Sequence, residues 1–243
     1  MNQACCNVPP AVSKGYSPKG KYIDLNTTGP SHATSAIFII YDIFGFSDQA
    51  IQGADILAHA DAKSGHEYQV FMPDFFLGKP LSHSDYPPDT EEKQKTVGAF
   101  FGGPAAPPKN AGKVPGLVKE IEKQCSGIQK WGSLGMCWGG KIVSLTAQPG
   151  TNFSAAAEVH PAMVDPKDAK DIKIPVCMLA SGDEDADAVK KFGEALSVPN
   201  HIETFSDQVH GWMAARADLE NEKVKKEYER GYQVLLDFYH KHL

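Results

Sequence analysis

A repeated alternation of short apolar runs and amphipathic segments most constrains the fold of this chain. The run Ala36–Tyr41 is apolar throughout, as expected for a strand that is buried on both faces. The segment 48–62 that follows carries its apolar residues at helical spacing. Strand-like and helix-like segments then alternate to the C-terminus. This pattern predicts an α/β fold, with a doubly wound, mainly parallel sheet and helices on both faces.

The other expected elements continue this alternation. We expect further strands over residues 69–72, 130–134, 153–159, 172–180 and 202–205. We expect further helices over residues 90–101, 114–123, 139–147, 186–196 and 219–242. The segments 78–88 and 102–109 are rich in Gly and Pro, which predicts irregular links.

The domain organisation follows from the length and from the N-terminal segment. Residues 1–20 contain Pro9, Pro10 and Pro18, which favours an extended arm over a core element. Residues 21–243 show no repeat and no low-complexity linker, and their number suits one domain. We therefore expect a single α/β domain preceded by an arm.

Composition excludes several classes of protein. A formal net charge of −6 argues against a nucleic-acid-binding protein, which usually presents a basic face. No apolar run approaches the roughly 20 residues that span a bilayer, and the first 20 residues lack the apolar core of a signal peptide. The five cysteines are irregularly spaced, which does not suggest a disulfide framework. These features predict a cytoplasmic protein, monomeric or homodimeric, with no membrane or nucleic-acid partner.

The strongest motif is Gly135-Met-Cys137-Trp138-Gly139-Gly140, between an expected strand and an expected helix. This is the context of a nucleophile elbow, a turn so tight that glycine is required two residues before and after the nucleophile. The start of the helix favours the thiolate of Cys137, and the Trp138 N–H would face a developing oxyanion. The alternative is a plain tight turn with an inert cysteine, although a G-x-G-x-x-G nucleotide motif is missing.

A candidate acid and a candidate base follow the elbow in the chain. The expected strand 172–180 leads into an acidic turn with Asp183 and Asp185, and the strand 202–205 leads to His210. A hydrolase elbow has its acid and then its base in this order. The turn favours Asp185 as the acid, with Asp183 as the second choice. The alternatives are a helix N-cap for the acids and an ordinary loop histidine.

The elbow, the G-x-x-D turn and the terminal His-Gly together resemble the dienelactone hydrolase family, over the chain from about Ala36 onward. The resemblance implies an α/β-hydrolase fold, a Cys-His-Asp triad, and no metal or cofactor. It also implies that the Ile43 N–H is a second oxyanion donor, and that Asp42 stands where the family has a glutamate beside the thiol. Arg216, after His210, is the arginine candidate for holding a substrate carboxylate.

We expect the substrate pocket to be formed by side chains near the carboxyl edge of the sheet. The candidates are Phe44, Phe76, His160, Trp212 and Arg216. A structural role in the core is the alternative for His160 and the aromatic residues.

These observations predict an enzyme that cleaves an ester or lactone bond of a small molecule through a Cys137 acyl-enzyme. One alternative is a class I glutamine amidotransferase, for which His201 and Glu203 supply a His-x-Glu pair. The other is a hydrolase-fold protein that acts in binding or redox sensing without catalysis.

Overall fold

A seven-stranded sheet forms the centre of the computed structural model, which describes residues 16–20, 27–60 and 66–243. The strands are β1 Thr27–Thr28, β2 Ser35–Ile40, β3 Tyr68–Phe71, β4 Lys130–Met136, β5 Ala155–Val159, β6 Val176–Ser181 and β7 Asn200–Phe205. Their order is β1-β3-β2-β4-β5-β6-β7, and every pair except β1–β3 is parallel. The predicted mainly parallel sheet is therefore confirmed.

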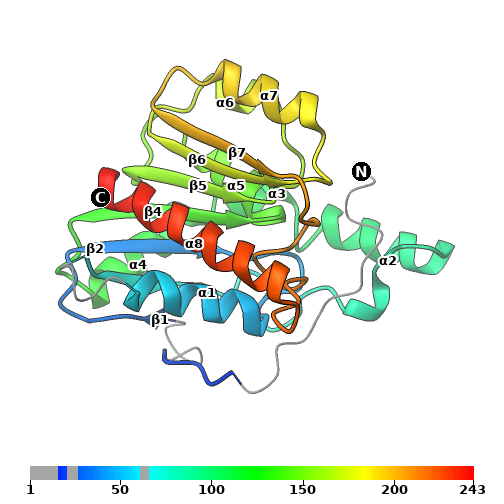
Figure 1. The fold of residues 1–243 in the computed structure, drawn as a ribbon, viewed down its shortest axis with the longest axis horizontal. Coiled ribbons are helices and arrows are strands. Elements are labelled where there is room, and N and C mark those ends of the chain that lie inside the picture. The colour runs from blue at the N-terminus through cyan, green and yellow to red at the C-terminus, as the bar shows by residue number, and fades with distance from the viewer. Residues whose placement is uncertain (1–15, 21–26, 61–65) are drawn as a thin grey trace.

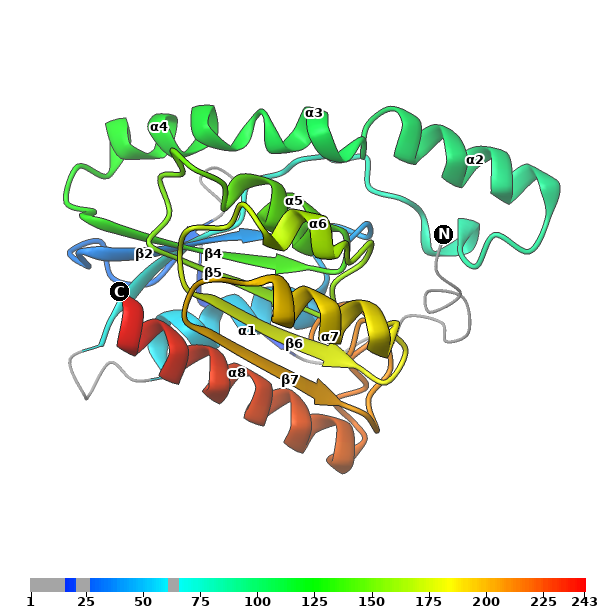
Figure 2. The same ribbon diagram turned by 90° about the horizontal axis from the view of Figure 1, so that it is seen from above.

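Helices cover both faces of this sheet (Figures 1 and 2). They are α1 Asp48–His59, α2 Glu91–Gly102, α3 Pro107–Ala111, α4 Val114–Gln124, α5 Trp138–Thr146, α6 Pro166–Ala169, α7 Ala186–Ala195 and α8 Glu222–His242, with a 3-10 turn η3 at His83–Asp85. Helices α1 and α8 pack together on one face, whereas α5 packs on β2, β4 and β5 from the other. Strands β2 and β4 are adjacent and parallel, so their carboxyl ends are neighbours.

The buried strands explain why the sequence pattern was informative. Residues 36–40 of β2 and all of β6 are buried, as expected for strands covered by helices on both faces. On α8 the apolar residues at helical spacing are the buried ones, including Tyr232, Leu235 and Tyr239. The core therefore lies between the layers and consists of side chains from both faces of the strands and from the apolar faces of the helices.

Three short elements lie outside the predicted pattern. Helix α3 occupies part of the predicted irregular link 102–109, and it begins with Pro107, whose fixed φ suits the first turn of a helix. The two-residue strand β1 and the four-residue helix α6 are too short to produce a periodic signal. Residues 1–15 of the predicted arm, residues 21–26 and residues 61–65 lie outside the described residues.

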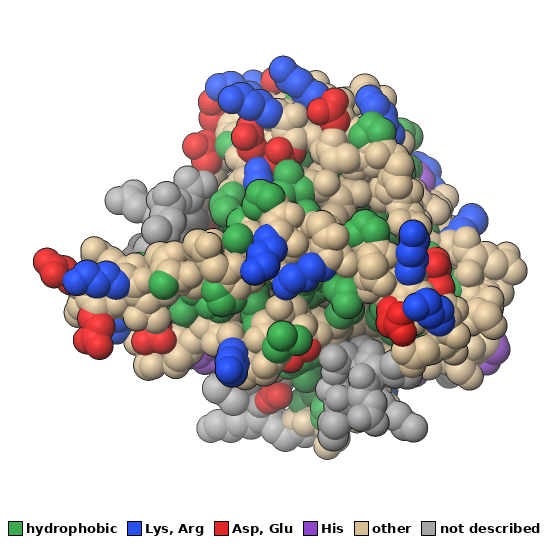
Figure 3. Space-filling view, turned by 180° about the vertical axis from the view of Figure 1, so that it is seen from behind, with side chains coloured by type: hydrophobic (Ala, Val, Ile, Leu, Met, Phe, Trp, Pro, Cys, Tyr) green, Lys and Arg blue, Asp and Glu red, His purple; other side chains and the backbone are tan. Residues whose placement is uncertain are grey.

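On the face shown in Figure 3, Lys and Arg side chains are interspersed with Asp and Glu and do not merge into one basic surface. Helix α2 extends past the carboxyl edge of the sheet (Figure 2), and only Val97 and Phe100 of this helix are buried. In the described parts of the chain, no helix is both long enough and apolar enough to cross a membrane.

Candidate active site

Cys137 occupies a sharp turn between β4 and α5. Its backbone has φ 52° and ψ −112°, a conformation that L-residues adopt only under strain. The Cys137 N–H donates to the Val159 carbonyl at 3.1 Å, which attaches the turn to the end of β5. Trp138 is the first residue of α5, so its N–H has no acceptor within the helix. The strand, turn and helix of the predicted elbow are therefore confirmed.

The glycines on either side of Cys137 are required by close backbone contacts. A Cβ atom on Gly135 would lie 2.3 Å from the Gly139 carbonyl oxygen. A Cβ atom on Gly139 would lie 2.0 Å from the Ile40 carbonyl oxygen. Both distances are too short for any side chain, so helix α5 can start directly behind the elbow only because these positions are glycine.

His210 lies in the loop after β7 and is fixed by two acidic residues of the loop after β6. Its backbone N–H donates to Asp183 Oδ2 at 2.8 Å. Its ring Nδ1 lies 2.6 Å from Glu184 Oε1, and both side chains are buried. With Glu184 ionised, Nδ1 carries the proton and Nε2 is the basic nitrogen.

Glu184 points into the protein because the end of β6 holds its carboxylate. The Ser181 N–H and the Ser181 hydroxyl both donate to it, the hydroxyl at 3.0 Å. Asp185, the acid expected from the sequence, is exposed and is not brought to His210. Its Oδ1 accepts from the N–H groups of Asp187 and Ala188, at 2.9 and 3.1 Å, as the N-cap of α7. The expected placement of Asp185 beside His210 is thus wrong, because Asp185 caps α7 and Glu184 lies at the His210 ring instead.

Asp42 organises the loop at the end of β2. Its Oδ1 accepts from the Phe44 N–H at 2.8 Å, and its Oδ2 accepts from the Ala215 N–H at 3.4 Å. Burial raises the pKa of Asp42 to about 6, against the smaller opposing effect of these backbone donors. Asp42 therefore joins the loop that carries Ile43 to the segment that follows His210.

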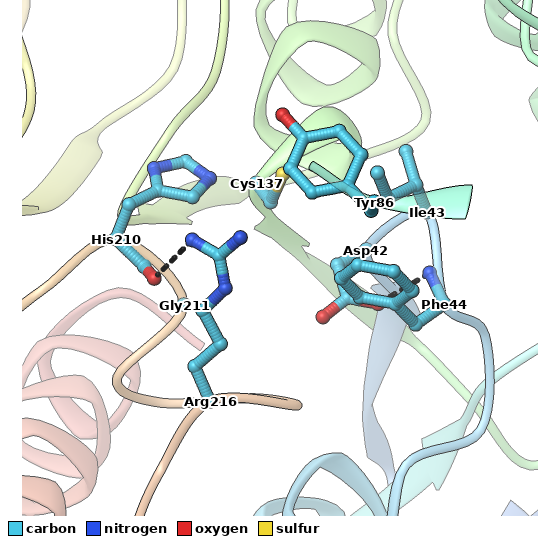
Figure 4. Close-up of a pocket in the computed structure, with 8 residues that line it drawn as sticks. All are labelled: Asp42, Ile43, Phe44, Tyr86, Cys137, His210, Gly211 and Arg216. Atoms are coloured by element: carbon cyan, nitrogen blue, oxygen red, sulfur yellow. Dashed lines mark hydrogen bonds between the residues drawn. The ribbon is translucent and has the colours of Figure 1, made fainter. Parts of the chain in front are cut away.

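These elements meet at one small cavity, drawn in Figure 4. Its lining residues are Asp42, Ile43, Phe44, Tyr86, Cys137, His210, Gly211 and Arg216. It encloses about 10 Å³, which is room for about one water molecule. Only 6% of Cys137 and 4% of His210 is exposed. The cavity brings together the predicted nucleophile, the predicted base and the Ile43 loop.

Arg216 and Tyr86 both line this cavity. The Arg216 guanidinium donates to the His210 carbonyl at 3.3 Å and lies 5.7 Å from the centre of the Tyr86 ring. In Figure 4 it points toward the space between His210 and Tyr86. Arg216 was expected at the site, whereas Tyr86 was not, because it lies in the predicted loop 78–88 without any recognisable motif.

The other expected pocket residues divide into two groups. Phe44 lines the cavity. Phe76 packs in an aromatic cluster, with its ring 4.9 Å from those of Phe100 and Trp138, and Trp212 packs on Phe205 at 4.4 Å. His160 does not line the cavity but contacts the His210 ring. Phe76 and Trp212 are therefore core residues here, which corrects their assignment to the pocket.

Two further arrangements bear on other functions. Among residues 16–20, 27–60 and 66–243, no three His, Cys, Asp or Glu side chains are grouped as metal ligands. His201 and Glu203, the pair that the glutamine amidotransferase alternative requires, lie in β7 and are 3.3 Å apart. Neither lines the cavity at Cys137, so the structure does not bring this pair to the candidate nucleophile.

Several known proteins are similar to this chain. Residues 23–243 match the model of the dienelactone hydrolase family. An uncharacterized AIM2 family protein of Schizosaccharomyces pombe is 37% identical, with 94% of each chain covered. The human carboxymethylenebutenolidase homolog is 27% identical, with 89% of this chain and 86% of the relative covered.

Solved structures show the same fold. A putative dienelactone hydrolase from Klebsiella pneumoniae superposes with a TM-score of 0.66 at 17% identity, covering 89% of this chain and 92% of that one. The dienelactone hydrolase from Anabaena variabilis superposes with a TM-score of 0.62 at 14% identity, covering 89% and 90%. The predicted α/β-hydrolase fold is confirmed. The chain belongs to the dienelactone hydrolase family and is a hydrolase.

Proposed function

We propose that this hydrolase cleaves an ester or lactone of a small molecule through a covalent Cys137 intermediate, with His210 as the base and Glu184 as the acid that orients it. The observation that carries the proposal is the strained elbow at Cys137, which shares a cavity with His210 while Glu184 holds the far side of the His210 ring. Strain of this kind persists at functional sites, where the surrounding structure determines it.

The proposed reaction has two steps. His210 Nε2 takes the thiol proton while the Cys137 sulfur attacks the acyl carbon, and the backbone N–H groups of Ile43 and Trp138 bind the resulting oxyanion. His210 returns the proton to the leaving alkoxide, which gives a thioester and an alcohol. Water then attacks the thioester with His210 as the base, which releases the acid and restores the thiol. In a lactone the alcohol and the acid belong to one product.

The surroundings of the cavity favour a substrate that carries a negative charge. Arg216 is buried at 6% exposure and lies at the cavity wall beside Tyr86. A guanidinium at this place binds a carboxylate through paired hydrogen bonds. We infer that Arg216 orients an anionic ester or lactone. The name of the human relative, a carboxymethylenebutenolidase homolog, agrees with such a substrate.

A panel of aryl esters and lactones, with and without a carboxylate, tests this function. Wild type is expected to turn over, and intact-mass measurement is expected to detect an acyl adduct on Cys137. Adduct formation without turnover would instead favour the binding or redox-sensing alternative. The cytoplasmic location and the monomeric or homodimeric state stay predictions.

A further inference from the structure

His160 is a buried histidine directly beside the proposed base. It follows β5 with φ 37°, a left-handed conformation that is uncommon for a residue with a Cβ atom. Its N–H donates to the Leu179 carbonyl at 2.7 Å. Two residues later the Ala162 N–H donates to the Cys137 carbonyl at 2.9 Å. The turn that carries His160 is therefore attached to the nucleophile elbow.

The ring of His160 contacts the ring of His210. Their centroids are 5.3 Å apart and their planes make an angle of 73°, an edge-to-face contact. The opposite side of the His210 ring is held by Glu184 through Nδ1. His210 is thus enclosed by a carboxylate from the loop after β6 and by an imidazole from the end of β5.

The nitrogen atoms of His160 are unusual for so buried a side chain. The residue is fully buried, and neither Nδ1 nor Nε2 has a hydrogen-bond partner among the residues that the structure describes. Buried polar atoms without partners are costly and call for an explanation. A phenylalanine would fill similar space without this cost, so packing alone does not account for a histidine here.

The charge state of His160 follows from its surroundings. Burial, and after it the positive charges of His210 and Arg216, lower the pKa of His160 well below its usual range. His160 is therefore neutral, with one unprotonated nitrogen. The other charged or titratable groups around His210 are Asp183 and Glu184 after β6, Asp42 after β2, Cys137 before α5, and Arg216.

We propose that His160 is a positioning residue for His210, whose neutral imidazole stabilises the positive charge that His210 acquires when it takes the thiol proton. The lone pair of the unprotonated nitrogen favours a cation as neighbour. The effect on catalysis rests on the proposed function, in which His210 is the base. The contact between the two rings does not depend on that proposal.

The test is a pH titration of the ring nitrogens of His210 by NMR in wild type, His160→Phe and His160→Met. Both variants remove the ring nitrogens. Phe keeps a ring of similar size and Met fills irregular space, so the titration can be measured even if only one of the two variants folds. The midpoint of the His210 titration is expected to shift to lower pH by about half a unit or more. In His160→Gln, an amide oxygen is expected to restore at least part of the shift. His32→Phe, an exposed histidine before β2, is the control and is expected to leave the midpoint unchanged.

Turnover provides a separate readout. In His160→Phe, kcat is expected to fall by about threefold to tenfold with KM nearly unchanged, and the acid limb of the pH profile is expected to follow the NMR midpoint. An unchanged midpoint in both apolar variants would overturn the proposal. A shifted midpoint with unchanged turnover would support the coupling of the two rings and would contradict the proposed role of His210 as the base.

Discussion

Oε1 of Glu184 lies 2.6 Å from Nδ1 of His210, and both side chains are almost completely buried. A carboxylate in this place fixes the tautomer of the imidazole and stabilises its protonated form. The carboxylate is itself held by two donors from Ser181, so it cannot turn away without losing them. This pair carries the clearest test of the proposed triad.

Glu184→Gln is expected to lower kcat by about two orders of magnitude or more, because an amide neither holds the tautomer nor stabilises the imidazolium. Asp185→Asn is the matched control, since asparagine caps a helix about as well as aspartate. It is expected to keep nearly full activity. Steady-state kinetics on an activated ester would measure both. The reverse ranking would return the acid to Asp185.

The neighbouring positions 183, 184 and 185 show what the sequence could not supply. All three are acidic, and the spacing of the turn favoured Asp185. The side-chain direction decides between them, and it depends on contacts with Ser181, on the start of α7 and on the loop of His210. None of these contacts is visible as a sequence pattern.

Cys137 and the sheet were predictable for the opposite reason. Glycine at 135 is required by a backbone contact within the elbow itself, and glycine at 139 by the close approach of β2. Both glycines are visible in the motif, so the motif indicates the turn. The buried strands were predictable because each forms an apolar run in the sequence. Tyr86 reaches the cavity from an irregular loop whose path depends on tertiary packing, and local sequence gives no indication of it.

Cys137→Ala is expected to abolish turnover, with a loss of at least three orders of magnitude, and to leave the fold intact. The alanine keeps the buried volume nearly filled, since only the sulfur atom is lost. Kinetics would be measured beside the near-UV circular dichroism spectrum and the urea midpoint. Cys177→Ala, at a buried thiol of β6, is the control and is expected to retain activity. Retention of more than a tenth of wild-type kcat in Cys137→Ala would refute the proposed nucleophile.

Asp42→Asn is expected to accelerate alkylation of Cys137 by iodoacetamide. The variant removes a buried negative charge that disfavours a thiolate nearby, and it keeps an oxygen for the Phe44 N–H. Because burial raises the pKa of Asp42 to about 6, wild type loses this charge below about pH 6. The acceleration is therefore expected above pH 6 and should disappear below it. Equal labelling rates at pH 8 would show that Asp42 acts only by bracing the Ile43 loop.

Tyr86→Ala is expected to widen the small cavity at Cys137. The Tyr86 ring lines a space of about 10 Å³ above a thiol that is 6% exposed. Removing it should raise the rate of labelling by a bulky aromatic disulfide more than the rate with iodoacetamide. Ser84→Ala, in the same turn but exposed, is the control. An unchanged ratio of the two rates would mean that substrates reach Cys137 by another path.

Glu158→Gln is expected to change how stability depends on pH. Glu158 is buried in β5 and accepts a hydrogen bond from the Ser144 hydroxyl at 2.6 Å, which links the strand to α5. Burial raises the pKa of Glu158 to about 8, whereas the unfolded chain has its ordinary value of 4.5. The folded state therefore binds this proton more tightly, and its contribution to stability is full below pH 4.5 and declines as the pH rises to about 8. Each unit of difference corresponds to about 1.4 kcal/mol, so the decline should be a few kcal/mol at most.

Urea unfolding at pH 6 and pH 9 is expected to show a smaller loss of unfolding free energy between the two pH values in Glu158→Gln than in wild type. Glu220→Gln, at an exposed position, is expected to behave like wild type. The same loss in all three proteins would show that Glu158 is already ionised at pH 6.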